Sequence, residues 1–295
     1  MKQNSSGSFA ESLFQDGPDQ KFFFLTRPIE TILAELADFI ETRQGLALVS
    51  GDAGMGKTML VSALVQRLPQ SIHPIVITRP ATEPVGLIVS IARAMGLNIL
   101  EENLVDLTPL ADAVHGAARQ GQFFTVIIDD AHLLTDRHLD EIWILSQMEL
   151  RGQPLLPMVL VGGQELDRKI DSHANQALRQ LIHAKLSLPA LTPAETIDYI
   201  EHRLGQVESR FTAGFADDGS DQLFAITGGC PRRINQVCHQ ALERGGQANL
   251  PQVTRNLLME MEPGHLQEPQ DLQKPGRLSK KVGAVALQVR SRTVT

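Results

Sequence analysis

Short apolar runs alternate with amphipathic segments between residues 46 and 188. The runs have the length of buried strands, and we predict strands at 46–50, 75–77, 123–130, 157–162 and 184–188. Apolar residues between them recur every three or four positions, which predicts helices over about 59–68, 85–95, 109–119, 139–150, 164–170 and 174–183, with a loop at 101–108. Strands that alternate with helices favour a parallel α/β sheet.

The flanking segments follow a helical pattern without strands. Apolar positions between Pro28 and Ile40 repeat at helical spacing, and Pro28 suits a first helical turn. After Pro189, helices are predicted near 193–206, 217–226, 231–244 and 250–262. Thr192 and Glu195 have the spacing of a capping box, with a proline in the first helical position. A small all-helical domain is therefore expected after the sheet.

The composition suggests four parts along the chain. We predict a loose polar arm over 1–20, an α/β core over 21–190, a helical domain over 191–262 and a disordered tail over 263–295. The tail contains no acid after Asp271 but contains Lys274, Arg277, Lys280, Lys281, Arg290 and Arg292. Such a tail is compatible with contact to DNA, to an acidic partner or to a membrane surface, and also with a solvated segment that binds nothing.

Overall composition excludes several classes of protein. The chain has 295 residues, of which 42% are hydrophobic and 21% charged, so it can bury one large core or two small ones. Its net charge of -7 differs from the positive net charge that is typical of nucleic-acid-binding proteins. Cys230 and Cys238 lack metal-ligand spacing, which suits a reducing compartment. Because neither an apolar signal core nor a membrane-length apolar run is present, we expect a cytoplasmic protein without a membrane span.

The first candidate for chemistry is the segment Gly51–Thr58, which reads G-D-A-G-M-G-K-T. It matches the phosphate-binding loop pattern and lies between a predicted strand and a predicted helix. Glycines let successive backbone N–H groups point at one anion, and the helix N-terminus adds its positive end. Lys57 would reach the β- and γ-phosphates, and the Thr58 hydroxyl would contact Mg²⁺. Three consecutive phenylalanines, 22–24, lie earlier in the chain. We expect them either to anchor a core or to lie near the nucleotide base.

The second candidate is the pair Asp129 and Asp130, at the end of the predicted strand 123–130. Ligands of parallel α/β folds bind at the carboxyl edge of the sheet, and unpaired buried carboxylates are unfavourable. A bound Mg²⁺ accounts for Asp129, and Asp130 would polarise the attacking water. The alternative is a turn of two aspartates that only caps the following helix.

Phosphoryl transfer also needs positive charge on the γ-phosphate. Arg179 ends a predicted helix and could project into a neighbouring subunit, while Arg232 and Arg233 begin a helix of the helical domain. Each of these arginines could instead form an ordinary surface ion pair.

Several segments together resemble the AAA+ ATPases of the ExeA (general secretion pathway protein A) type, over about residues 20–262. They are the phenylalanines 22–24 with Arg27, the phosphate loop, VIIDDAHLL at 126–134, MVLVGGQEL at 158–166, LPALTPAETIDYIEHRLG at 188–205 and GGCPRRINQVCHQAL at 228–242. The resemblance implies a P-loop NTPase of the AAA+ and ASCE group, with a parallel five-stranded sheet sandwiched by helices and a small all-helical lid. It also implies ATP and Mg²⁺ as ligands and assembly into rings or filaments.

The resemblance implies roles for matching residues. Nucleotide would be bound by Gly51, Asp52, Ala53, Gly54, Met55, Gly56, Lys57, Thr58, Met59, Gln164 and Arg232. Mg²⁺ would be held by Thr58 and Asp129, and catalysis would use Lys57, Asp130, Arg179 and Arg232. Arg232 matches the sensor 2 arginine, Gln164 is the candidate for the sensor 1 polar group, and Arg179 is the nearest candidate for an arginine finger.

The chain departs from this family at three places. Residues 163–166 read Gly-Gln-Glu-Leu where the family usually has Gln-Pro-Glu-Leu, and residues 180–182 read Gln-Leu-Ile where it often has Gln-Arg-Ile. The third departure is at position 130. The family usually has glutamate where this chain has Asp130, and the shorter side chain predicts slow hydrolysis. We therefore predict a cytoplasmic ATPase that passes a conformational change to a partner, and the resemblance implies a role in secretion, pilus assembly or polysaccharide export. The alternative is a DNA-binding regulator of transposition in which ATP acts mainly as a switch. A GTPase and an ABC ATPase are disfavoured, because neither the Asn-Lys-x-Asp nor the Leu-Ser-Gly-Gly string is present.

Overall fold

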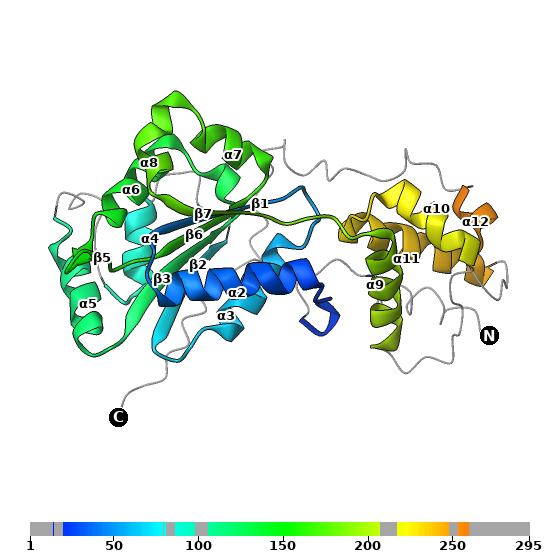
Figure 1. Cartoon of the computed structure of the whole chain (residues 1–295), viewed down its shortest axis with the longest axis horizontal. Helices are drawn as coiled ribbons and strands as arrows, with labels where there is room; N and C mark the ends of the chain where they lie inside the picture. The colour runs from blue at the N-terminus through cyan, green and yellow to red at the C-terminus, as the bar shows by residue number, and fades with distance from the viewer. Residues whose placement is uncertain are drawn as a thin grey trace, which may run out of the picture. The chain divides into compact units, whose positions relative to one another are not determined.

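The computed structural model describes residues 14, 20–78, 80, 86–97, 106–206, 217–247 and 253–259. The chain divides into two compact units, a sheet unit and a helical unit (Figure 1). The sheet unit comprises 27–53 and the described residues of 60–188. The helical unit comprises the described residues up to Thr26, the segment Gly54–Met59 and the described residues from Pro189 onward.

The sheet unit is built on five parallel strands in the order β2-β3-β6-β1-β7. The strands are β1 (Leu46–Ser50), β2 (Ile72–Thr78), β3 (Phe123–Asp129), β6 (Met158–Gly162) and β7 (Ile182–Ser187). Every residue of β1 and β6 is buried, as expected for strands with helices on both faces. The predicted parallel five-stranded sheet is confirmed.

Helices cover both faces of this sheet. They are α2 (Arg27–Glu41), α3 (Lys57–Arg67), α4 (Leu87–Ala94), α5 (Thr108–Arg119), α6 (Asp136–Ser146), α7 (Gln164–Ile170) and α8 (Gln176–Gln180). Alternate strand residues such as Leu48, Ile128 and Leu160 form one core with residues from α4, α5, α6, α7 and α8. Figure 1 shows α2 and α3 on the opposite side of the sheet from α6, α7 and α8.

The helical unit contains the short helix η1 (Gln20–Phe22), α9 (Pro193–Gly205), α10 (Asp217–Thr227), α11 (Pro231–Gln247) and α12 (Arg255–Met259). The predicted capping box of α9 is present, since Thr192 N–H donates to Glu195 Oε2 and Glu195 N–H to Thr192 Oγ1. Gly229 lies against Leu191, where a Cβ atom would lie 2.0 Å from the Leu191 carbonyl oxygen. No larger residue fits between these two backbone segments.

Phenylalanines that precede α2 pack inside the helical unit. The Phe24 ring meets the Tyr199 ring edge-on with centroids 5.8 Å apart, and Phe14 is buried in the same core. The Arg203 guanidinium, whose residue is 3% exposed, lies 4.5 Å from the centroid of Phe22 and 5.7 Å from that of Phe14. These contacts favour an apolar anchor as the role of the phenylalanines.

Some element boundaries differ from the predicted ones. Helix α6 ends at Ser146, and Leu150 belongs to a hairpin of β4 (Glu149–Leu150) and β5 (Gln153–Pro154) that the sequence analysis did not predict. Its two-residue loop has φ of 54° at Arg151 and 76° at Gly152, as tight hairpins require. Short 3-10 helices, η3 (Ala131–Leu133) and η4 (His173–Asn175), precede α6 and α8.

Several expectations concern residues outside the described ones. The predicted arm over 1–20 is described only at Phe14 and Gln20, and the predicted loop only at its last three residues, 106–108. The basic tail over 263–295 lies wholly outside the described residues, and the predicted helix over 250–262 is described from 253 to 259.

Candidate nucleotide site

The segment Gly51–Thr58 connects β1 to α3, so the predicted strand, loop and helix occur in this order. The Gly51 N–H donates to the Gly162 carbonyl oxygen at 3.2 Å, which ties the start of the loop to the neighbouring strand β6. Gly54 and Gly56 have φ of 84° and 90°, a left-handed conformation that side chains oppose. Lys57 is the first residue of α3 and Thr58 the second. This is the backbone arrangement in which successive N–H groups can surround a phosphate.

Asp52 of the loop is in contact with Gln164, the first residue of α7. Gln164 Nε2 donates to Asp52 Oδ1 at 2.7 Å, and both residues are exposed. The sheet unit therefore brings the candidate sensor 1 residue to the phosphate loop. Because a carboxylate only accepts hydrogen bonds, this contact orients the amide with its donor toward the loop.

Gly54 lies against the start of α11, in the helical unit. The Arg232 N–H donates to the Gly54 carbonyl oxygen at 3.2 Å. A Cβ atom on Gly54 would lie 2.7 Å from Arg232 Cβ and 3.0 Å from Cys230 Sγ, so this approach requires glycine. The candidate sensor 2 arginine thus contacts the phosphate loop through backbone, and the side chains of Arg232 and its neighbour Arg233 are exposed.

Asp129 and Asp130 follow the strand β3 at the carboxyl edge of the sheet. Strand β6 lies between β1 and β3, with Ser50 opposite Gly162 and Leu160 opposite Ile128, so β1 and β3 end at the same edge. Asp129 is 2% exposed, and its Oδ1 accepts the Asp130 N–H at 2.9 Å. Asp130 has φ of 53°, which turns the chain sharply into η3.

The oxygen donors of Thr58 and Asp129 are of the kind that Mg²⁺ prefers. Among the described residues, no group of three or more His, Cys, Asp or Glu side chains could hold a metal ion.

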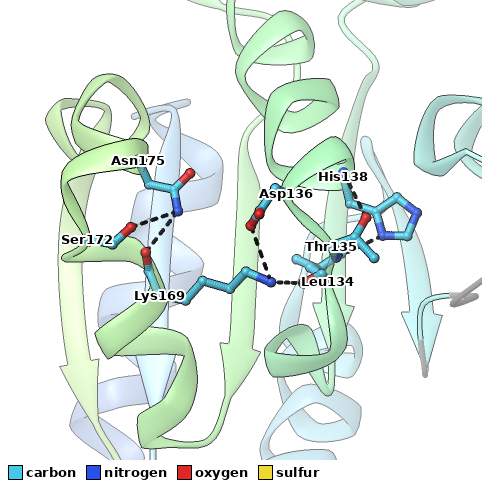
Figure 2. Close-up of polar contacts among 7 residues, drawn as sticks. All are labelled: Leu134, Thr135, Asp136, His138, Lys169, Ser172 and Asn175. Atoms are coloured by element: carbon cyan, nitrogen blue, oxygen red, sulfur yellow. Dashed lines mark hydrogen bonds and ion pairs between the residues drawn. The ribbon is translucent and has the colours of Figure 1, made fainter.

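The segment after the two acids is a compact turn closed by a capping box. The Thr135 N–H donates to His138 Nδ1, and the His138 N–H donates to Thr135 Oγ1, both at 3.3 Å. Figure 2 shows the two side chains at the first turn of α6. Burial lowers the pKa of His138, and the nearby Glu141 carboxylate partly opposes this shift. The local sequence does not indicate this box, because histidine here takes the place of the usual Glu or Gln.

Arg179, the candidate arginine finger, lies near the end of α8 just before β7, and its side chain is exposed. This position suits contact with a second molecule, whereas Gln164 and Arg232 contact the loop within one chain.

Residues 40–170 match the family described as AAA domain. The strand order and the strand–loop–helix segment agree with this match, and the sheet unit has the P-loop NTPase fold of the solved structures given below.

The chain is similar to General secretion pathway protein A of Aeromonas hydrophila, with 27% identity over 237 residues. The match covers 79% of this chain and 43% of that protein, so the chain spans less than half of its relative. The predicted resemblance to the ExeA type is confirmed.

Three solved structures with the same fold each share 17% sequence identity with this chain. Cdc6p from Pyrobaculum aerophilum superposes with a TM-score of 0.60 over 82% of this chain and 68% of that one. Drosophila ORC bound to DNA superposes with a TM-score of 0.60 over 88% of this chain and 65% of that one. The RuvB Holliday junction branch migration motor of Thermotoga maritima superposes with a TM-score of 0.53 over 84% of this chain and 72% of that one. At this identity the likeness shows the fold alone. Among the described residues, no helix has the length and apolar character required to cross a membrane.

Proposed function

We propose that this chain binds ATP with Mg²⁺ and hydrolyses it at the edge of the sheet where β1 and β3 end. The observation that carries this proposal is that the phosphate loop and a buried aspartate lie at the same edge of the sheet. The phosphate loop starts after β1, and a buried aspartate ends β3, two strands away in the same parallel sheet. A phosphate loop alone supports binding, whereas the additional carboxylates support metal-assisted transfer of the γ-phosphoryl group.

Each residue has a role in this proposal that follows from its chemistry. Backbone N–H groups from Gly51 to Met59 would hold the phosphates, and Lys57 would neutralise the β- and γ-phosphates. Thr58 and Asp129 would hold the metal, which screens the phosphate charge when bound. Asp130 would orient and polarise the attacking water. Gln164, Arg232 and, from a second copy, Arg179 would contact the γ-phosphate.

The similarity to General secretion pathway protein A supports a role next to a secretion, pilus or export assembly. ATP binding and hydrolysis would alternate two conformations of this chain, and a protein partner would respond to one of them. A ring or filament of identical chains would allow Arg179 to act across the subunit boundary.

A second candidate function is an ATP-gated DNA-binding regulator. The basic residues after Asp271 favour it, while the net charge of -7 does not. If this alternative holds, binding of duplex DNA will require ATP and will weaken steeply as salt concentration rises, because phosphate contacts release counterions. The secretion-type role predicts no such ATP-dependent binding.

Binding is tested with the variant Lys57→Ala. Titration calorimetry with a non-hydrolysable ATP analogue and Mg²⁺ should show binding to the wild-type chain and severe loss in Lys57→Ala. Lys185→Ala is the matched control, because this exposed lysine pairs with Asp167 of α7 and with Asp171 directly after that helix. Equal affinity in wild type and Lys57→Ala would contradict the proposed site.

A further inference from the structure

The last turn of helix α7 carries a lysine, Lys169, that reaches the turn after the two acids. The Lys169 ammonium group donates a hydrogen bond to the Leu134 carbonyl oxygen, and its Nζ lies 3.6 Å from Asp136 Oδ1 (Figure 2). The Lys169 side chain is only 29% exposed, whereas that of Asp136 is 85% exposed. The main partner of this largely buried cation is therefore a backbone carbonyl four residues after Asp130.

The other end of α7 contacts the phosphate loop through the hydrogen bond from Gln164 to Asp52. With seven residues, α7 is about 10 Å long, and one end contacts the phosphate loop while the other contacts the turn that follows the two acids. The Asn175 Nδ2 atom donates to the Lys169 carbonyl oxygen at 2.8 Å, which fixes the end that carries the lysine. A displacement of Gln164 would therefore be carried by a short rigid element to Lys169.

The turn itself depends on its neighbours for its shape. Asp130 has a left-handed φ of 53°, which for a residue with a side chain costs about 1 kcal/mol and persists only where the surroundings hold it. The Asp130 carbonyl oxygen accepts the Leu133 N–H at 2.9 Å, and the His132 N atom lies 3.1 Å from where a Cβ on Gly162 would be. Strand β6 therefore supports the start of the turn, and Lys169 supports its exit.

We propose that Lys169 is a positioning residue for Asp130, and that α7 links the occupant of the phosphate loop to the placement of this acid. This inference rests on the proposed function, because the proposed function gives Asp130 the role of orienting the attacking water. Without the ammonium group, the exit of the turn loses its bond and Asp130 no longer has one fixed orientation. Nucleotide binding depends on the loop backbone and Lys57, so it should persist.

The test compares steady-state ATP hydrolysis in three variants. Lys169→Met keeps the length of the side chain but removes the donor, and Lys169→Arg keeps a charged donor. Lys185→Met is the matched control, because it also removes an ammonium group that contacts α7, through Asp167 and Asp171, but on a side chain from β7. Affinity for MgADP and the thermal midpoint are measured for each variant.

The expected result is a separation of turnover from binding. A misplaced catalytic group lowers rates by about tenfold to a hundredfold, so kcat of Lys169→Met should fall into that range. Its affinity for MgADP should stay within about twofold of wild type, since the binding groups are untouched. Lys169→Arg should recover most of the turnover, and Lys185→Met should retain it. If Lys169→Met does not fold, Lys169→Gln, which is shorter and uncharged, is expected to give the same separation.

A combined variant shows whether Lys169 acts through Asp130. Residues that act as one unit are not additive, so Lys169→Met should cause no further loss of turnover in an Asp130→Ala background. A further loss there, wild-type turnover in Lys169→Met, or a parallel loss of MgADP affinity without rescue by arginine would each overturn the inference. The proposed function fails separately, and the inference with it, if the wild-type chain hydrolyses no ATP.

Discussion

Asp130 is the residue on which the expected rate of hydrolysis depends. Its carboxylate is one methylene shorter than the glutamate usual in the resembling family, while its backbone is fixed in a sharp left-handed turn. A water molecule bound to the γ-phosphate would therefore lie farther from the acid than proton transfer favours. At the scale of single residues, we expect this feature to limit turnover without affecting nucleotide binding.

The variant Asp130→Glu should raise kcat several-fold while leaving the affinity for MgADP unchanged, because the longer side chain places the carboxylate nearer the water. Phosphate release under saturating ATP measures this directly. Asp140→Glu, at an exposed position of α6, is the control and should have no effect. An unchanged or lower rate in Asp130→Glu would show that the length of the side chain does not limit the reaction.

Residue chemistry in the candidate site was largely predictable, whereas the contacts that position it were not. The spacing of residues in Gly51–Thr58 and the two acids after an apolar run can both be recognised from short stretches of sequence. The pairing of Gln164 with Asp52 spans 112 positions and that of Lys169 with Leu134 spans 35. No local pattern specifies such contacts, since they depend on how β1, β3 and β6 are ordered in the sheet.

At the scale of elements, some helix caps can be predicted from local sequence and others cannot. The box at α9 follows the usual Thr and Glu spacing and was predicted, whereas that at α6 uses His138 and was not. Helix α4 has Gly86 at its N-cap, so a carboxylate from another helix takes over: Glu141 Oε2 accepts the Ile88 N–H at 3.0 Å. Such a cap cannot be read from the sequence around α4.

The capping box at α6 predicts a dependence of stability on pH. Because His138 Nδ1 accepts the Thr135 N–H, the folded state needs a neutral ring, consistent with the lowered pKa. As pH falls below about 6.5, the unfolded histidine binds a proton before the folded one does. The free energy of unfolding should therefore decrease from pH 6.5 downward until the pH reaches the folded pKa.

Urea unfolding at several pH values, in wild type and His138→Gln, isolates this contribution. Glutamine can accept the same N–H bond but does not titrate, so the variant should lose less stability than wild type between pH 7 and pH 5.5. Other titrating groups affect both proteins alike. Parallel curves for the two proteins would show that His138 has no part in the pH dependence.

At the scale of the whole molecule, the sheet unit was predicted well, because alternation of apolar strands and amphipathic helices is a strong signal. The hairpin β4–β5 was missed because four strand residues around Arg151 and Gly152 give little periodicity. Phenylalanines 22 and 24 pack with Tyr199 and Arg203, which are distant in sequence, and only the folded helical unit reveals those neighbours.

The central claim is that the phosphate loop and the two acids form one site for ATP hydrolysis. The most direct measurement is steady-state phosphate release from ATP by the purified wild-type chain and by Lys57→Ala, with and without Mg²⁺. The account predicts a slow wild-type rate that saturates with ATP, requires Mg²⁺ and disappears in Lys57→Ala. Phosphate release that is absent from the wild type, or that persists undiminished in Lys57→Ala, would contradict it.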